Sequence, residues 1–307
     1  IVIGAGVIGS SVAYHLARFG ASNVLVLERL QIGAGTTTQS SGILRTHYSV
    51  LENVELARQS WSVFTDFAGY LGDEDASAGL VRCGYLICAP DGPKLDPLRQ
   101  ALEGQRSKGI EVSYLDQREA RDLLPIARFD DAALIGYEPE AGFADAYLVA
   151  TGFARAARRA GVRIMEGVSV EQLLTDKGRV VGVRTAQGEQ RADSVMVNAD
   201  FASAITKLVP NNLRRRWTNE KVAKKDFSCS TFMLYLGVEG KFDHLAHHNI
   251  YVTKDYRRNL DEIEHQHVLS EDPSFYVENP VRTDATMAPP GHSALYVLLP
   301  VTHLHPN

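Results

Sequence analysis

The sequence has few cysteines and no long hydrophobic run. Its three cysteines are Cys83, Cys88 and Cys229, and an odd number cannot form a closed set of disulfides. Cys83 and Cys88 are also too far apart for a Cys-x-x-Cys redox pair. Because no run of about 18 apolar residues is present, no membrane-spanning helix is expected. These absences favour a reducing, cytoplasmic compartment.

An initiator Met, a charged leader and a strong net charge are also missing. The chain opens on the strand-like Ile1-Val2-Ile3 and runs straight into glycines, so no signal peptide is expected. It stops at His305-Pro306-Asn307, just past an apolar run, and we therefore expect both ends to be truncated. A formal net charge of -5 gives no general attraction to nucleic acid. With 307 residues, one large domain or two interleaved ones are expected.

The strongest positive signal is a glycine motif at the start of the chain. The strand-like Ile1–Ile3 leads into Gly4-Ala5-Gly6-Val7-Ile8-Gly9, and residues 10–19 have helical apolar spacing that ends at Gly20. A second apolar strand over residues 23–27 ends in Glu28. This order of strand, glycines, helix, strand and acid is typical of a dinucleotide-binding βαβ unit.

Each part of that unit has a physical role. Gly4 permits the tight turn, Gly6 leaves space for a pyrophosphate, and Gly9 lets the helix pack closely on the sheet. The first turn of the helix offers N–H groups and the positive end of its dipole to the phosphates. Glu28 is placed to accept hydrogen bonds from a ribose diol, and its charge would repel a 2′-phosphate, which argues against NADP.

The rest of the chain alternates between helical and strand-like segments. A loop rich in glycine and hydroxyl groups, residues 33–42, is suited to line a ligand. The chain is expected to leave the nucleotide domain near residue 42 and to re-enter it near Asp145. Helices are predicted over residues 51–70, 96–108, 116–124 and 145–160, and strands over 80–89, 162–165, 168–174, 179–185 and 191–197.

Two polar clusters were weighed as binding sites. Arg214, Arg215, Arg216 and Trp217 form a basic patch that could contact an anionic membrane, although a solvated surface is the simpler interpretation. Five histidines resemble metal ligands: His244, His247, His248, His265 and His267. The adjacent His247 and His248 suit chelation poorly if the segment is extended, because neighbours then point to opposite faces. No cysteine or carboxylate set completes a tetrahedron, so no metal site is predicted.

Residues 1 to about 200 resemble the D-amino-acid oxidase superfamily of FAD enzymes, and within it sarcosine oxidase, glycine oxidase and dimethylglycine dehydrogenase. The matching segments are the glycine motif, residues 26–29, the loop 33–42 running into Arg45, and residues 139–145, 154–158 and 182–185. The resemblance implies that the loop wraps the FAD and that Arg45 faces a substrate carboxylate. Gln39 stands where the dimethylglycine dehydrogenase branch carries a flavin-linking histidine, which implies a non-covalent FAD.

Residues from about 178 to 307 resemble bacterial phytoene desaturases, another FAD family. The matching segments are residues 228–237, 247–251, 255–259, 272–276, 288–292 and 296–298. Both families share the strand pair within residues 178–200, so either resemblance implies FAD, whereas the substrate differs between them. A natural fusion, an artificial chimera and an assembly error are all open.

The combined expectation is an α/β fold: a Rossmann-like FAD-binding domain of the glutathione-reductase type, interleaved with an α+β substrate domain and truncated at its C-terminus. The FAD-binding domain is assigned to 1–45 and 145–205, and the substrate domain to 46–144 and 206–307. The residues expected to bind FAD are Gly4, Gly6, Val7, Ile8, Gly9, Glu28, Arg29, Gly35, Thr36, Thr37, Ser40, Ser41, Gly42, Val170 and Ala199.

Three functions follow from these observations. The first is oxidation of the C–N bond of a small amino acid or N-methyl amine to an imine, with Arg45 binding a carboxylate. The second is a desaturase acting on a carotenoid precursor, held on a membrane by the basic patch. The third is a non-catalytic nucleotide-binding fragment or chimera. The oligomeric state and the electron acceptor are left open.

Overall fold

The computed structural model describes residues 1–303, so the terminal His305-Pro306-Asn307 lies outside the described residues. By internal contacts the chain divides into two compact units, residues 1–218 and residues 219–307. Each unit is described by itself below. The discontinuous division into 1–45 with 145–205 and 46–144 with 206–307 stays a prediction.

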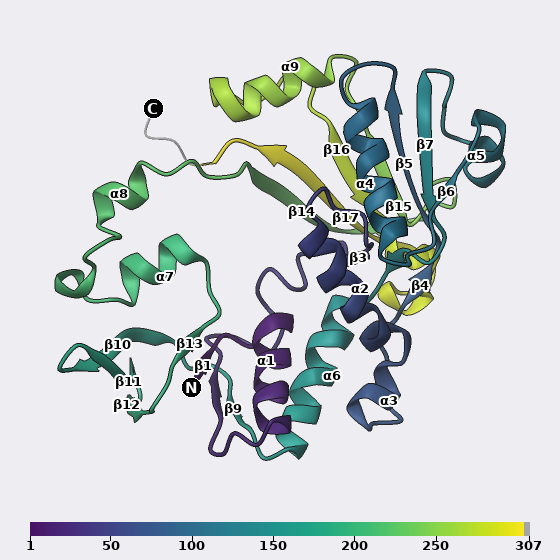
Figure 1. The fold of residues 1–307 in the computed structure, drawn as a ribbon. Coiled ribbons are helices and arrows are strands. Elements are labelled where there is room, and N and C mark those ends of the chain that lie inside the picture. Colours follow the sequence, from purple (N-terminus) through teal and green to yellow (C-terminus); the bar gives the residue numbers. More distant parts are fainter. Residues whose placement is uncertain (304–307) are drawn as a thin grey trace. The chain divides into compact units, whose positions relative to one another are not determined.

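The first unit is organised around a small parallel sheet in the order β13-β1-β2-β9. Its apolar strands are buried as the sequence predicts, with Val26 fully buried and Leu25 and Leu27 nearly so. Helices α1 and α6 lie side by side against it (Figure 1) and bury Ala13, Val149 and Phe153 in a common core. The bounds are β1 Val2–Ile3, α1 Val7–Arg18, β2 Leu25–Leu27, α6 Ala146–Arg159, β9 Arg163–Met165 and β13 Met196–Val197.

A second sheet of the first unit is antiparallel, in the order β10-β11-β12. The predicted single strand over 191–197 is wrong, because the chain changes sheets there. Its beginning belongs to β12, which pairs antiparallel with β11, whereas its end is β13, which pairs parallel with β1. One continuous strand cannot follow both directions, and residues 192–195 form the bend. The bounds are β10 Val170–Asp176, β11 Arg179–Thr185 and β12 Gly188–Arg191.

The segment between the two halves of the parallel sheet carries helices and short antiparallel strands. The predicted helix 51–70 divides at Asp66, whose side chain accepts a hydrogen bond from Gly69 N and so caps a new helix. The predicted strand 80–89 breaks at Gly84, where φ is +78°. The bounds are β3 Ile43–Leu44, α2 Leu51–Thr65, α3 Phe67–Leu71, β4 Val81–Arg82, β5 Tyr85–Pro90, α4 Leu95–Ser107, β6 Ser113–Tyr114, α5 Gln117–Leu123, β7 Ala132–Glu138 and β8 Gly142–Phe143.

These strands form two three-stranded sheets, β3-β8-β4 and β5-β7-β6. Helix α4 packs on the second sheet through Leu98 and Leu102, with Leu134 of β7 in the same core. The capping box of Asp116 and Glu119 begins α5 near the predicted position. The first unit closes with α7 Phe201–Lys207 and the short helix η1 Asn211–Leu213.

The second unit contains a four-stranded antiparallel sheet in the order β14-β17-β16-β15. Strands β14 and β17 pair along ten residues, from Ser230 opposite Val301 to Glu239 opposite His292. The bounds are α8 Asn219–Ala223, β14 Ser230–Glu239, β15 His248–Tyr251, α9 Tyr256–Asp261, η2 Glu262–Gln266, β16 Phe275–Glu278, η3 Pro280–Arg282, η4 Ala285–Met287 and β17 His292–Val301.

The predicted basic patch is not a uniform exposed surface. Arg214 is buried, and Trp217 packs edge-on against Phe201 at 5.1 Å between ring centroids. Only Arg215 and Arg216 of the patch are exposed, with Arg216 stacked over the Trp217 ring at 5.4 Å. Burial removes Arg214 from any surface contact, so the expectation of a contact through all four residues is wrong for this arginine.

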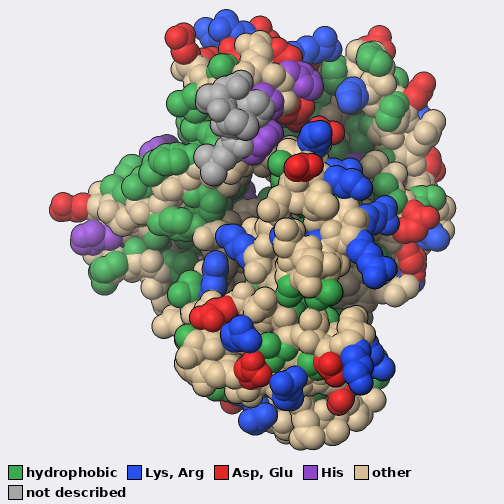
Figure 2. All heavy atoms as spheres, turned by 90° about the vertical axis from the view of Figure 1, so that its left-hand side faces the viewer, with side chains coloured by type: hydrophobic (Ala, Val, Ile, Leu, Met, Phe, Trp, Pro, Cys, Tyr) green, Lys and Arg blue, Asp and Glu red, His purple; other side chains and the backbone are tan. Residues whose placement is uncertain are grey.

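The charges show no single-sign surface on the face drawn in Figure 2, where acidic and basic side chains are interspersed. Within residues 1–303, every helix is too short or too polar to cross a bilayer.

Candidate functional site

The opening turn has the geometry that its glycines predict. Gly4 adopts φ +96°, a left-handed conformation that side chains disfavour. At Gly9 an added Cβ would lie 1.9 Å from the carbonyl oxygen of Gly4, so only glycine allows helix α1 to begin this close to the turn. The helix and the first strand are thereby held in direct backbone contact.

The N-terminus of α1 presents backbone N–H groups. Gly6 is the N-cap and offers no side chain to cap the helix. The N–H of Val7 donates to Oγ1 of Thr37 at 2.9 Å. Within residues 1–303, the N–H groups of Ile8 and Gly9 have no protein acceptor. Uncapped N–H groups at the positive end of a helix dipole suit a phosphate.

The carboxylate of Glu28 points at this turn. Its Oε2 accepts from the N–H of Ala5 at 2.7 Å, and its Oε1 accepts from the N–H of Leu30 at 2.9 Å. Each carboxylate oxygen has two lone pairs, so both can still accept a hydrogen bond from a ribose hydroxyl. The acid is therefore oriented by the backbone before any ligand binds.

The loop 33–42 contacts the turn through two residues. Besides the hydroxyl of Thr37, the N–H of Gly33 donates to Ala5 O at 3.0 Å. Farther along, Gly42 has φ +63°, and an added Cβ would lie 2.1 Å from Ala144 O, so the end of the loop packs directly on the backbone that precedes α6. The other predicted loop residues, Gly35, Thr36, Ser40 and the half-buried Ser41, stay at the surface, as does Arg29.

Sequence reasoning overlooked Asn198 at this turn. Its N–H donates to Ile3 O at 3.0 Å, and its carbonyl would lie 2.7 Å from a Cβ added to Gly4. The neighbouring Ala199 was predicted to bind FAD. Both residues lie just after an apolar strand, and this position was the signal that the sequence offered for them. Val170 lies at the start of β10, packed on the core of Leu25 and Leu27.

Arg45 lies half-buried between aromatic rings. Its guanidinium carbon is 4.8 Å from the ring centroid of Tyr48 and 5.5 Å from that of Tyr85. Its Nη1 donates to the carbonyl of His47. No carboxylate among residues 1–303 pairs with it. Tyr48 also lines an open hollow on α2. This cation is therefore oriented by aromatic contacts and keeps donors for an anion.

A buried polar network follows Arg45 and was not predicted. The carboxylate of Glu138 accepts from Thr46 N at 2.9 Å and Thr46 Oγ1 at 2.7 Å, both through Oε1. Gln105 Nε2 donates to Glu138 Oε2 at 3.1 Å, and Gln105 Oε1 lies 2.8 Å from His47 Nδ1. Thr46, Gln105 and Glu138 are 4%, 0% and 4% exposed. Thr46, Gln105 and Glu138 lie in three segments that are far apart in sequence, so no sequence pattern predicted that they would meet.

Comparison with known proteins places the first unit in a family. The model of a family described as "FAD dependent oxidoreductase" (DAO) matches residues 1–218. This range covers the glycine turn, Glu28, the loop 33–42 and Arg45, which are the segments on which the first sequence resemblance depends. That resemblance and the predicted FAD cofactor are confirmed.

The matching curated relatives described here are desaturases, which agrees with the second resemblance seen in the sequence. The chain is 44% identical over 162 residues to a zeta-carotene-forming phytoene desaturase of Myxococcus xanthus, covering 52% of this chain and 31% of the relative. It is 41% identical over 154 residues to a 4,4'-diapophytoene desaturase of a Methylomonas species, covering 50% and 30%. The chain thus spans about a third of the length of these relatives.

Solved structures share the fold. A glycine oxidase from Bacillus cereus matches with TM-score 0.61 and 21% identity, covering 99% of this chain and 73% of that one. An L-proline dehydrogenase from P. horikoshii matches with TM-score 0.62 and 23% identity, covering 78% and 60%. At these identities the likeness supports the predicted α/β fold class and no particular substrate.

Proposed function

The chain belongs to the DAO family of FAD dependent oxidoreductases, and from that premise we propose that it oxidises the C–N bond of a small amino acid or N-methyl amine to an imine. The observation that carries this proposal is Arg45, a cation without an acidic partner within residues 1–303, held between Tyr48 and Tyr85. A planar guanidinium can bind a substrate carboxylate through two parallel hydrogen bonds.

We assign FAD binding to the turn and its contacts. The N–H groups of Ile8 and Gly9 are placed to bind the pyrophosphate, and Glu28 is placed to bind the ribose. The hydroxyl of Thr37 accepts a hydrogen bond from Val7 N, and from this position it can donate its own hydrogen to a phosphate oxygen. Gly35, Thr36, Ser40, Ser41 and Gly42 would line the cofactor from the loop, and Arg29, Val170 and Ala199 would complete the site.

The bound FAD supplies the acceptor for a hydride equivalent. The residues of the chain bind the substrate and orient it. Arg45 fixes the substrate carboxylate, and Tyr48 and Tyr85 hold the guanidinium in place and shield it from water. The buried Glu138–Thr46–Gln105 network fixes the backbone that follows Arg45, because each donor in it has a defined acceptor.

An anaerobic substrate screen tests the proposal. The FAD-loaded chain is mixed with sarcosine, glycine or D-alanine without oxygen, and flavin absorbance is followed. Bleaching by one of these amines is the expected result. Arg45→Lys should raise the substrate KM by about tenfold or more, because a bidentate contact is lost, while Arg216→Lys, an exposed arginine, should not. Bound flavin that no amine reduces would overturn the proposal.

A second candidate function is a desaturase acting on an apolar polyene. The 44% identity to the Myxococcus xanthus phytoene desaturase supports it. Strand β14 supports it as well, because Phe232, Leu234 and Leu236 alternate onto one face of the sheet and are exposed. Large exposed apolar groups in a row suit a lipid or polyene contact better than a small zwitterion.

The two functions separate in one assay. Phytoene presented in liposomes should reduce the flavin if the desaturase function holds, and amines should not. In that case Arg215 and Arg216 would support contact with an anionic surface, and liposomes with anionic lipids should bind the chain more tightly than neutral ones. Failure of both substrate classes with flavin bound would favour the non-catalytic fragment.

A further inference from the structure

Two histidines and a glutamate converge in the second unit. His248 begins β15 and stands directly opposite Glu278 of β16 in the antiparallel register, so their side chains share one face of the sheet. His247 precedes the strand in a bend, and its ring centroid lies 4.4 Å from that of His248. The expectation that these neighbours point to opposite faces is wrong, because it assumed that both residues are in the strand.

The ligand atoms of these three side chains lie within 4.8 Å of one another. His247 Nε2 is 3.1 Å from Glu278 Oε1. Four-coordinate zinc with bonds of about 2.0–2.1 Å places its ligand atoms roughly 3.4 Å apart. The His247–Glu278 pair is close to that spacing, and neither distance from the His248 ligand atom to the other two exceeds 4.8 Å.

Neighbouring hydroxyl groups orient both imidazole rings. His247 Nδ1 lies 2.8 Å from Thr283 Oγ1, and His248 Nδ1 lies 2.6 Å from the hydroxyl of Tyr276. When Nδ1 is held by a hydrogen bond, Nε2 is the nitrogen that faces a metal, which is how metal-bound histidines are usually supported. A His–Glu ion pair does not require a hydroxyl partner on each imidazole ring, whereas a metal site uses such partners to orient its ligands.

From this geometry we propose that His247, His248 and Glu278 form a binding site for a divalent transition metal of the zinc class. Two imidazoles and one carboxylate are a recognised three-ligand set for zinc, with the fourth position left to water. The side chains of His247 and Glu278 are 12% and 16% exposed, so the site is shielded but open to solvent. All three ligands belong to the second unit, and none of them is among the residues assigned to FAD or to the substrate carboxylate.

Zinc binding to the full chain tests the proposal directly. After treatment with chelator, Zn²⁺ is titrated by calorimetry, and Co²⁺ is added in parallel because its visible absorption bands report tetrahedral coordination. One ion per chain is expected. Glu278→Gln keeps the size of the side chain and the acceptor for His247 but removes the charge, and it should weaken Zn²⁺ binding by at least about tenfold. Thr283→Val should weaken it by roughly 10- to 100-fold through the orientation of His247.

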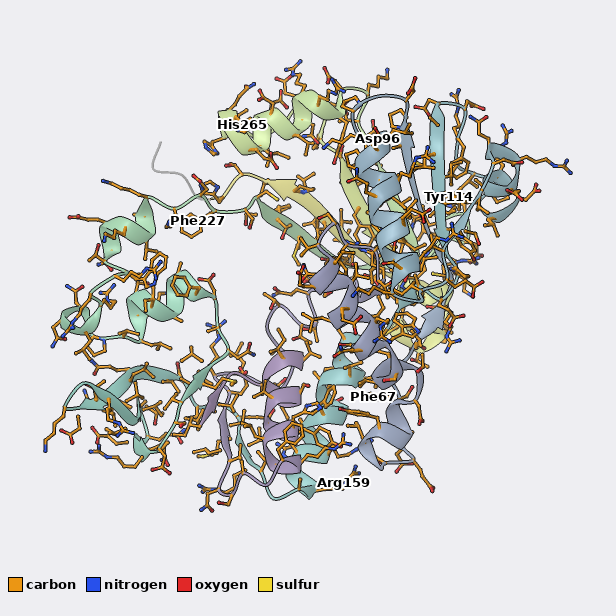
Figure 3. All side chains as sticks on the ribbon, in the orientation of Figure 1. Phe67, Asp96, Tyr114, Arg159, Phe227 and His265 are labelled. Carbon is orange, nitrogen blue, oxygen red and sulfur yellow. The ribbon has the colours of Figure 1, made fainter. Side chains whose placement is uncertain are left out.

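Other histidines of the same unit provide the control. His265, at the end of η2 (Figure 3), is exposed and outside the cluster, so His265→Ala should bind Zn²⁺ as the unchanged chain does. Circular dichroism of each variant shows whether it folds. If folded Glu278→Gln and Thr283→Val bind Zn²⁺ as tightly as the unchanged chain, or if His265→Ala removes the binding, the proposed site is wrong.

Discussion

The N–H of Ala5 donates a hydrogen bond of 2.7 Å to the carboxylate of Glu28. This bond ties the glycine turn after β1 to the end of β2, although the two residues are 23 positions apart in sequence. A second bond, from Leu30 N, holds the other carboxylate oxygen. The carboxylate that we propose binds the ribose is therefore positioned by the backbone, in the absence of any ligand.

Removal of this carboxylate should weaken FAD binding. Glu28→Ala deletes charge-assisted hydrogen bonds worth about 1.5–3 kcal/mol each, so the Kd for FAD should rise by roughly 10- to 100-fold. Quenching of FAD fluorescence on titration measures this. Glu171→Ala, at an exposed position of β10, is the control, and an equal loss in both variants would contradict the assigned role.

A side chain added at Gly9 should disrupt the packing of the glycine turn. A Cβ at Gly9 would lie 1.9 Å from Gly4 O, so Gly9→Ala forces the helix away from the strand at a cost of about 1–3 kcal/mol or more. Lower Tm and weaker FAD binding are expected together. Gly237→Ala is the matched control, because nothing lies within 4 Å of its added Cβ. An unchanged FAD affinity in Gly9→Ala would show that the close packing is not needed.

The buried network after Arg45 should contribute to stability. Glu138→Ala leaves the N–H and the hydroxyl of Thr46 buried without their acceptor, at about 1–3 kcal/mol for each, and Gln105 Nε2 keeps only its bond to Thr46 Oγ1. Urea unfolding should show a clear decrease in the free energy of unfolding. Glu140→Ala removes only an exposed ion pair with Arg82 and should change that free energy by less than about 1 kcal/mol. Equal effects would mean that the network does not hold the Arg45 segment.

Asp73 should make stability depend on pH. Burial raises the pKa of this carboxyl, but hydrogen bonds and charge from Arg159 and Arg155 outweigh burial and leave the pKa lowered. The arginine nitrogens lie 2.7 and 2.5 Å from Oδ2, and Arg159 ends α6 (Figure 3). Because the unfolded chain binds the proton more readily, this stabilisation is present above about pH 4 and is lost as the pH falls through the folded pKa.

Melting curves of Asp73→Asn test this linkage. The variant should have a lower Tm than the unchanged chain at pH 7, and the difference should shrink below about pH 4. Asp130→Asn is the control, since Asp130 also pairs with two arginines but is 57% exposed. A constant Tm difference from pH 7 to pH 3 would contradict the role of the Asp73 charge.

The sequence by itself determined the βαβ unit and its cofactor. Gly4, Gly9 and Glu28 are close in the chain, and their conformational needs are local, so a single pattern of glycines and apolar residues specifies the turn. Helices such as α4 and α5 were also predicted to within about a residue, because their periodicity and caps are local signals.

Tertiary structure alone decided the rest. Glu138, Gln105 and Thr46 meet only because β7, α4 and the segment after β3 pack together, and no local pattern encodes such a meeting. The convergence of His247 with His248 depends on a bend that places the first residue outside the strand. Contacts between distant segments arise from packing, and a single sequence carries no direct signal of them.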